Sequence, residues 1–264
     1  MIRNGSLTID GARMDYIRFG SGSRVLIMLP GLGDGLRTVA GTALPMALLY
    51  RKFAKQYTVY AFSRREPLAE GCTTRDMAAD QAKAMEALGI DRADILGVSM
   101  GGMIAQWLAI DHPERVGKLI LTVTCPEPNP ILTESVQEWV DLAKRGDHAG
   151  FMDSNLRRIY SERYYRRNRW LTPLVGALTK PKSCERFFRQ ADACLTHDAL
   201  AELPSIKAQT LVIGGEKDLA LGSEASRILA QQIPGAELRM YSDWGHGLYE
   251  EAGDFNDVVL AFLG

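Results

Sequence analysis

Short apolar runs alternate with longer amphipathic segments along the first half of the chain. Residues 25–29, 58–62, 93–96 and 116–123 carry almost only apolar side chains, which is typical of strands buried on both faces of a parallel sheet. The segments between them repeat their apolar residues at helical spacing. Alternation of this kind over residues 25–124 predicts an α/β fold, with a mostly parallel sheet wound by right-handed crossovers.

Other patterns predict the elements around this sheet. Residues 7–9 and 14–19 flank Asp10-Gly11, a strong hairpin signal, so two antiparallel strands should open the sheet. Thr73 can cap a helix that stops at Gly89. A further packing helix is predicted over residues 41–56 from the helical spacing of its larger apolar residues, which are Leu44, Leu48, Leu49 and Phe53.

The alternation of strand patterns and helix patterns ends after residue 125. Residues 126–204 contain no convincing strand, only helical segments separated by proline and glycine. Strand patterns return at residues 209–213 and 236–241, and a final helix is predicted over residues 248–263. We therefore expect a core formed by residues 1–125 and 205–264, with residues 126–204 inserted as helices.

One candidate nucleophile lies at the junction of a predicted strand and a predicted helix. Gly97-Val98-Ser99-Met100-Gly101 has the Gly-x-Ser-x-Gly form, in which glycine avoids side-chain clashes on both sides of a cramped turn. The hydroxyl of Ser99 should stand at the carboxyl edge of the sheet. The amide of Met100, at the start of the new helix, should face the atom under attack.

A glycine-rich loop, Pro30-Gly31-Leu32-Gly33-Asp34-Gly35, follows the strand at residues 25–29. A dinucleotide-binding loop begins in the same way, but its third glycine is replaced here by Leu36. We interpret the segment instead as a loop that brings the backbone amide of Leu32 toward Ser99, as the second donor of an oxyanion hole.

A serine nucleophile needs a base within hydrogen-bond reach and a third group that orients the base. His246 lies in a loop just beyond the last predicted strand, where the carboxyl edge of the sheet should be. The other three histidines lie at a predicted helix end or within the helical segment, namely His112, His148 and His197.

Three carboxylates can be the third group. Asp218 follows a buried strand and lies between Ser99 and His246 in chain order, which favours it. Glu127, just beyond an earlier strand, and Asp243, three residues before the histidine, are the alternatives.

Four motifs in their order along the chain resemble those of the α/β-hydrolase superfamily: Pro30-Gly31-Leu32-Gly33, Gly97-Val98-Ser99-Met100-Gly101-Gly102, Gly214-Gly215-Glu216-Lys217-Asp218 and Gly245-His246. The resemblance covers nearly the whole chain. It implies an eight-stranded core whose helical cap, residues 126–204, is inserted after the sixth strand. One departure is Pro30, where many members have histidine.

The resemblance also implies roles for these residues. Ser99 would be the nucleophile, His246 the acid and base, and Asp218 the residue that orients it, with Leu32 and Met100 supplying oxyanion amides. Ser-Met-Gly-Gly is similar to the branch that contains carboxylesterases, enol-lactonases and hydrolases of carbon–carbon bonds in ring-cleavage products. Haloalkane dehalogenases and epoxide hydrolases place aspartate at this turn instead.

Composition excludes several partners and cofactors. The formal net charge is −1, which gives no reason to expect nucleic acid as a partner. No apolar stretch reaches the length of a membrane span or a secretory signal, so we expect a cytoplasmic protein without a membrane partner. The four cysteines form no Cys-x-x-Cys pair, no clustered metal ligands occur, and no cofactor is expected.

Positive charge is concentrated in the helical segment. Residues 141–190 contain 12 basic and 5 acidic side chains, and residues 157–170 are the densest part. Leu156, Ile159, Tyr160 and Tyr164 would fall on one face of a helix, which predicts an amphipathic helix with a solvated arginine face. The alternative is that these arginines attract an anionic substrate.

Together these patterns predict a serine hydrolase that cleaves a small ester, thioester or lactone through an acyl-enzyme. One alternative is cleavage of a carbon–carbon bond in a keto acid, whose carboxylate the basic segment could bind. A second alternative is a protein that keeps the fold for ligand binding without turnover. The sequence does not give the oligomeric state.

Overall fold

The computed structural model describes residues 1–264, which form one eight-stranded sheet in the order β1-β2-β4-β3-β5-β6-β7-β8. β1 and β2 pair antiparallel, β2 is antiparallel to β4, and every later pairing is parallel. The predicted mostly parallel, eight-stranded sheet is therefore confirmed. The strands span Arg3–Ile9, Ala12–Gly20, Arg24–Leu29, Tyr57–Phe62, Ala93–Val98, Val116–Thr122, Gln209–Gly215 and Glu237–Tyr241 in chain order.

The first two strands form the predicted hairpin. Ile9 pairs with Ala12, so the loop contains only Asp10 and Gly11, and their φ angles are 49° and 80°. A two-residue turn with positive φ at both positions matches the right-handed twist of its strands. Aspartate and glycine tolerate that backbone conformation, which explains why this dipeptide marks the turn.

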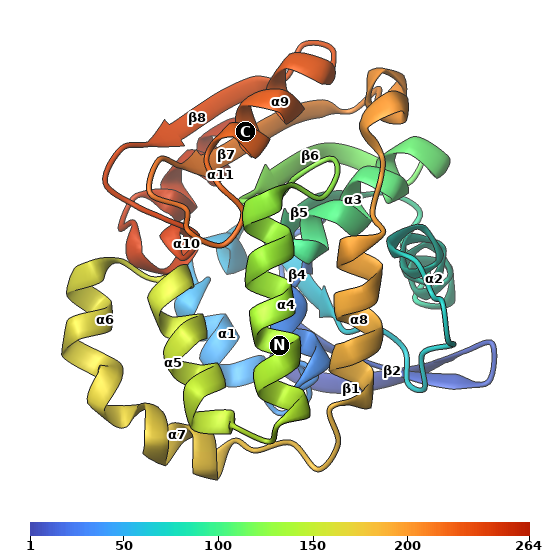
Figure 1. Cartoon of the computed structure of the whole chain (residues 1–264). Helices are drawn as coiled ribbons and strands as arrows, with labels where there is room; N and C mark the ends of the chain where they lie inside the picture. The colour runs from blue at the N-terminus through green and yellow to red at the C-terminus, as the bar shows by residue number, and fades with distance from the viewer.

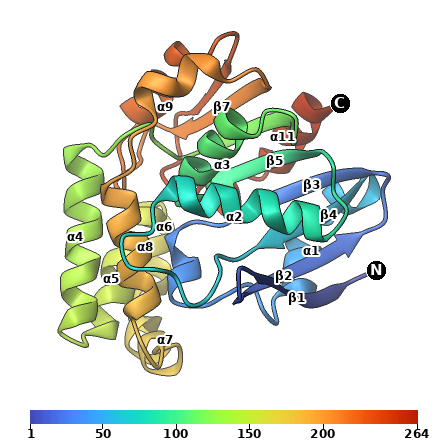
Figure 2. The ribbon, with the colours of Figure 1, turned by 90° about the vertical axis from the view of Figure 1, so that its right-hand side faces the viewer.

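Helices cover both faces of the sheet (Figures 1 and 2). One hydrophobic cluster joins one face to α2 (Thr74–Ala87), α3 (Met100–Asp111) and α9 (Glu224–Gln232). A second cluster joins the other face to α1, α10 and α11, which span Ala43–Leu49, Leu248–Glu251 and Phe255–Leu263. The strands are consequently buried on both sides, as their continuous apolar runs predicted.

Between β6 and β7 the chain forms five α-helices and two short 3₁₀ helices but no strand, so the predicted helical insertion after the sixth strand is confirmed. Figure 2 shows these helices gathered over one end of the sheet, away from the two chain termini. That end is the carboxyl end of the parallel strands. The helices are α4 to α8, spanning Pro130–Lys144, His148–Ile159, Glu162–Asn168, Thr172–Leu178 and Glu185–Leu195.

Short 3₁₀ helices complete the chain. They are η1 to η4, spanning Leu32–Gly35, Phe53–Lys55, Arg169–Leu171 and Leu200–Ser205. None of the helices is long and apolar enough to cross a membrane.

The helix predicted over residues 41–56 is wrong in its length, and of the four residues predicted for its buried face only Phe53 is buried. The structure has a short α1 followed by η2, and Leu44, Leu48 and Leu49 are 58%, 64% and 46% exposed. Buried Ala43 and Tyr50 contact the core in their place. Helical spacing of leucines indicates one face of a helix, but the tertiary structure decides whether that face is buried.

Two other predicted helices are interrupted. The backbone of Tyr160 is extended, with φ −100° and ψ 164°, so α5 ends at Ile159 and Ser161 caps α6. Tyr164 therefore does not continue the helical face of Leu156. The C-terminal helix is likewise split into α10 and α11 at residues 252–254.

Candidate active site

Ser99 lies in a strained turn between β5 and α3. Its φ and ψ are 54° and −122°, a conformation that few residues with side chains adopt. A Cβ on Gly101 would lie 1.9 Å from the carbonyl oxygen of Leu29, and one on Gly97 would lie 2.6 Å from Gly101. Both positions therefore require glycine because neighbouring backbone already fills the space.

Two backbone amides lie near this turn. The amide of Met100 is the first of α3, where helix geometry offers it no acceptor, and it donates no hydrogen bond within the protein. The loop after β3 passes beside Ser99, because a Cβ on Gly31 would be 3.4 Å from the Cβ of Ser99. The amide of Leu32 also has no acceptor in the protein. Both donors are thus free to bind an oxygen atom of a ligand.

His246 and Asp218 form a buried pair. Nδ1 of His246 lies 2.8 Å from Oδ2 of Asp218, and the two side chains are 5% and 2% exposed. The other carboxylate oxygen of Asp218 accepts hydrogen bonds from the amides of Ala220 and Leu221, at 2.8 and 3.0 Å. This pairing directs Nε2 of the imidazole away from the carboxylate.

The two alternative carboxylates do not contact His246. The side chain of Asp243 is 81% exposed and lies 3.5 Å from Nζ of Lys217. Glu127 is exposed. Of the three candidates, the structure places only Asp218 beside the imidazole.

Ser99 and His246 line the same cavity, although no hydrogen bond joins their side chains. Its volume is about 350 Å³, and its walls come from the loop after β3, from α4, α5 and α8 of the insertion, and from Tyr249. No lysine or arginine lines it. The polar side chains are few, and the remainder of the lining is mainly hydrophobic: Leu32, Leu36, Trp139, Phe151, Met152, Ile159, Tyr160 and Phe187.

The insertion is joined directly to the loop that carries His246. The amide of Gly247, the next residue, donates to the carbonyl of Ile159 at 2.6 Å. The hydroxyl of Tyr160 donates to Glu250 at 2.7 Å, and the hydroxyl of Ser161 donates to Glu251 at 2.7 Å. The break between α5 and α6 therefore positions Ile159 and Tyr160 at the cavity. No motif or spacing in the sequence predicted this contact.

The arginines of residues 157–170 lie in two different environments. Arg158 is mostly buried, and its guanidinium contacts Glu134 and Glu138 at 2.9 and 2.7 Å. The others in residues 157–170 are exposed, namely Arg157, Arg163, Arg166, Arg167 and Arg169. None of these arginines lines the cavity with Ser99.

A buried ionic cluster that the sequence patterns did not predict borders the same cavity, and its central residue, Asp34, is one of the cavity's lining residues. Oδ2 of Asp34 accepts hydrogen bonds from the guanidinium of Arg186 and from the amide of Arg64, the second at 3.1 Å. Gln190 donates to the same oxygen at 3.3 Å. Nη2 of Arg64 donates to the carbonyl of Pro30 at 2.6 Å. The cluster thus joins α8 of the insertion to the loop that carries Leu32.

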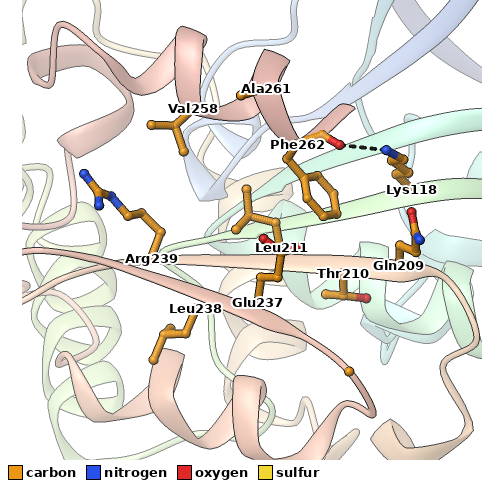
Figure 3. Close-up of a pocket in the computed structure, with 11 residues that line it drawn as sticks. Lys118, Gln209, Thr210, Leu211, Glu237, Leu238, Arg239, Val258, Ala261 and Phe262 are labelled. Carbon is orange, nitrogen blue, oxygen red and sulfur yellow. Dashed lines mark hydrogen bonds between the residues drawn. The ribbon is translucent and has the colours of Figure 1, made fainter. Parts of the chain in front are cut away.

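A larger pocket than the one with Ser99 lies elsewhere (Figure 3). It has a volume of about 620 Å³ and lies between β7, β8 and α11, near the amino ends of the parallel strands. Nζ of Lys118 donates to the carbonyl of Phe262 at 2.7 Å on its wall. It contains neither Ser99 nor His246, so size alone does not identify the candidate site.

A model of the alpha/beta hydrolase fold matches residues 24–253. The chain belongs to the alpha/beta hydrolase fold family. It is accordingly a hydrolase of this fold, as the motifs predicted.

The relatives of this hydrolase are named for different substrates. It is 27% identical to 2-hydroxy-6-oxononadienedioate/2-hydroxy-6-oxononatrienedioate hydrolase 2 of Pseudomonas putida, over 99% of this chain and 94% of that protein. The structure of Est816, an N-acyl homoserine lactone degrading enzyme, is 27% identical with a TM-score of 0.77, covering 98% and 100% of the chains. The enol-lactonase from Burkholderia xenovorans LB400 has a TM-score of 0.80 at 23% identity, covering 98% and 99%.

Proposed function

We propose that the protein is a serine hydrolase that cleaves a small, uncharged ester or lactone through an acyl-enzyme. The observation that carries this proposal is the cavity that contains both Ser99 and the His246–Asp218 pair. Residues 126–204 act as the cap of that cavity, because they supply most of its hydrophobic wall.

The first half of the reaction forms the acyl-enzyme. Nε2 of His246 removes the proton of Ser99 as Oγ attacks the substrate carbonyl, and the imidazolium that results is stabilised by Asp218. The amides of Leu32 and Met100 donate to the oxyanion, and the absence of a competing acceptor leaves both ready to do so. The protonated His246 then gives its proton to the leaving alcohol.

The second half regenerates the enzyme. Water enters the cavity, His246 removes one of its protons, and the hydroxide attacks the acyl carbon. Collapse of the second tetrahedral intermediate releases the carboxylic acid and returns the proton to Ser99. In a lactone the alcohol and the acid stay in one product molecule.

The lining favours an uncharged substrate over a keto acid. A carboxylate without a cationic partner would be poorly solvated in a mainly apolar cavity, and no lysine or arginine lines this one. Thioesters remain within the same chemistry. Cleavage of a carbon–carbon bond in a keto acid is the second candidate, because the Pseudomonas putida relative is named as a hydrolase of 2-hydroxy-6-oxononadienedioate, which is a keto acid.

Turnover of p-nitrophenyl butyrate by the wild type and by Ser99→Ala tests the proposal. We expect the variant to lose several orders of magnitude in kcat, because the nucleophile, base and orienting residue act as a unit. A fluorophosphonate probe should label the wild type but not Ser99→Ala. Exposed Ser242→Ala is the matched control.

Two outcomes would contradict the proposal. Unchanged hydrolysis by Ser99→Ala would exclude the mechanism, and a folded wild type that the probe does not label would favour ligand binding without turnover. Faster turnover of a dienoic keto acid than of any ester would support the carbon–carbon bond hydrolase.

A further inference from the structure

A second pocket lies within the insertion, beside the cavity that contains Ser99. Its volume is about 270 Å³, and six of its nine lining residues are hydrophobic. The walls come from α5, α6, η3 and α7, and they include Leu156, Tyr164, Leu171 and Val175. No charged side chain lines this insertion pocket.

The two cavities share one wall. Met152, Asn155 and Tyr160 line both of them. A residue that faces two cavities separates them, so no further layer of the protein stands between the insertion pocket and the cavity with Ser99 at this point.

The shared wall combines a fixed part with an adaptable part. The hydroxyl of Tyr160 is held by Glu250, and its ring stacks on Tyr164 with centroids 4.5 Å apart. Met152 is unbranched and has three rotatable bonds, so it adjusts to neighbouring groups at low cost. The side chain of Asn155 makes no hydrogen bond within the protein. Rotation of Met152 beside a fixed Tyr160 can therefore join the two cavities.

We propose that the insertion pocket binds the acyl chain of the substrate while the ester carbonyl lies at Ser99. The inference rests on the proposed function and names its substrate class, which is esters or lactones with an unbranched alkyl chain of medium length. An alkyl chain fits because the pocket is uncharged and mainly apolar, and because it adjoins the cavity where the carbonyl reacts.

Hydrolysis of p-nitrophenyl acetate, butyrate and octanoate tests the inference. We expect kcat/KM to rise along this series by up to roughly fourfold for each methylene that becomes buried. Val175→Phe fills the insertion pocket without touching the cavity that contains Ser99, because Val175 lines only the former. The neighbouring Leu174 is 57% exposed and lines neither, so Leu174→Phe is the matched control.

The inference predicts a selective loss. Val175→Phe should lower the octanoate-to-acetate ratio of kcat/KM at least tenfold with acetate hydrolysis within twofold of wild type, whereas Leu174→Phe should leave the ratio unchanged. Leu171→Phe gives a second filled pocket in case the first variant fails to fold. Acetate hydrolysis without any preference for longer chains would overturn the inference and leave the proposed function standing.

If no ester is hydrolysed, a binding measurement tests the alkyl subsite separately from the proposed function. The absence of hydrolysis would contradict the proposed function. Calorimetric titration of the same proteins with 1-octanol would then show whether the insertion pocket binds an alkyl chain. Binding at least tenfold weaker in Val175→Phe than in Leu174→Phe supports an alkyl subsite. Equal binding overturns it.

Discussion

The buried cluster around Asp34 gives the sharpest test of how the insertion is held to the core. Asp34→Ala removes the carboxylate and leaves Arg64 and Arg186 buried, with side chains 1% and 8% exposed. Glu66, whose side chain is 59% exposed, would be the remaining carboxylate within reach of Arg186, at 3.4 Å from Nε. Two cations would then lie close together with little water around them.

The expected cost follows from this burial. Removing one partner of a buried ion pair typically destabilises a protein by about 3–5 kcal/mol, because an uncompensated charge remains inside. Three further features place Asp34→Ala at the upper part of that range. Arg64 is fully buried, burial already lowers its pKa, and Nη1 of both arginines has no hydrogen-bond partner even in the wild type.

Chemical unfolding in urea, followed by fluorescence, measures the effect. Asp257→Ala is the control, because it breaks an ion pair with Lys52 whose side chains are 43% and 57% exposed. Surface pairs of this kind contribute about 0–1 kcal/mol. A loss below about 1 kcal/mol for Asp34→Ala would refute the reasoning, since it would mean that water reaches the arginines.

A double variant separates charge from packing. Arg186→Met keeps a long apolar side chain while removing one of the two cations. If uncompensated charge causes the loss, Asp34→Ala/Arg186→Met should be more stable than Asp34→Ala alone. Additive losses would show that Asp34 acts through packing instead.

Three other changes have definite expected outcomes. Gly101→Ala should destabilise the protein severely, since its Cβ would meet Leu29 at 1.9 Å, whereas Gly253→Ala has open space around it and should unfold at the wild-type temperature. Burial lowers the pKa of His197 to about 3, so between pH 6.5 and about pH 3 only the unfolded state binds its proton. Stability should fall by up to about 1.4 kcal/mol per pH unit as the pH is lowered through this window, and titrated unfolding of His197→Phe should lack that slope. Asp218→Asn should lower kcat for p-nitrophenyl butyrate by roughly 10⁴-fold through the wrong imidazole tautomer, and a change below tenfold would contradict the assigned role.

The elements of the sheet could be predicted because each depends on local pattern. Apolar runs identify strands buried on both faces, and Asp10-Gly11 identifies the hairpin because few dipeptides tolerate its backbone angles. The absence of strand patterns in residues 126–204 likewise located the insertion. The leucines of α1 show the limit of this approach, because spacing defines a helical face but not what covers it.

Part of the candidate site could likewise be predicted from local sequence, and part depended on the folded structure. Ser99 could be found from sequence because the glycines that its turn requires lie within two residues of it. The choice of Asp218 over Glu127 and Asp243 as the partner of His246 was favoured by chain order, but only folding brings one carboxylate within 2.8 Å of the imidazole.

Contacts between distant segments were decided by the tertiary structure alone. Asp34, Arg64 and Arg186 lie far apart in sequence, and each taken singly has the pattern of a surface residue. Ser161 is a local signal for the start of α6. The hydrogen bonds that hold the break, from Tyr160 to Glu250 and from Ser161 to Glu251, join segments far apart in sequence. Local backbone preferences are encoded within a few residues, whereas burial and charge pairing depend on which segments the whole fold brings together.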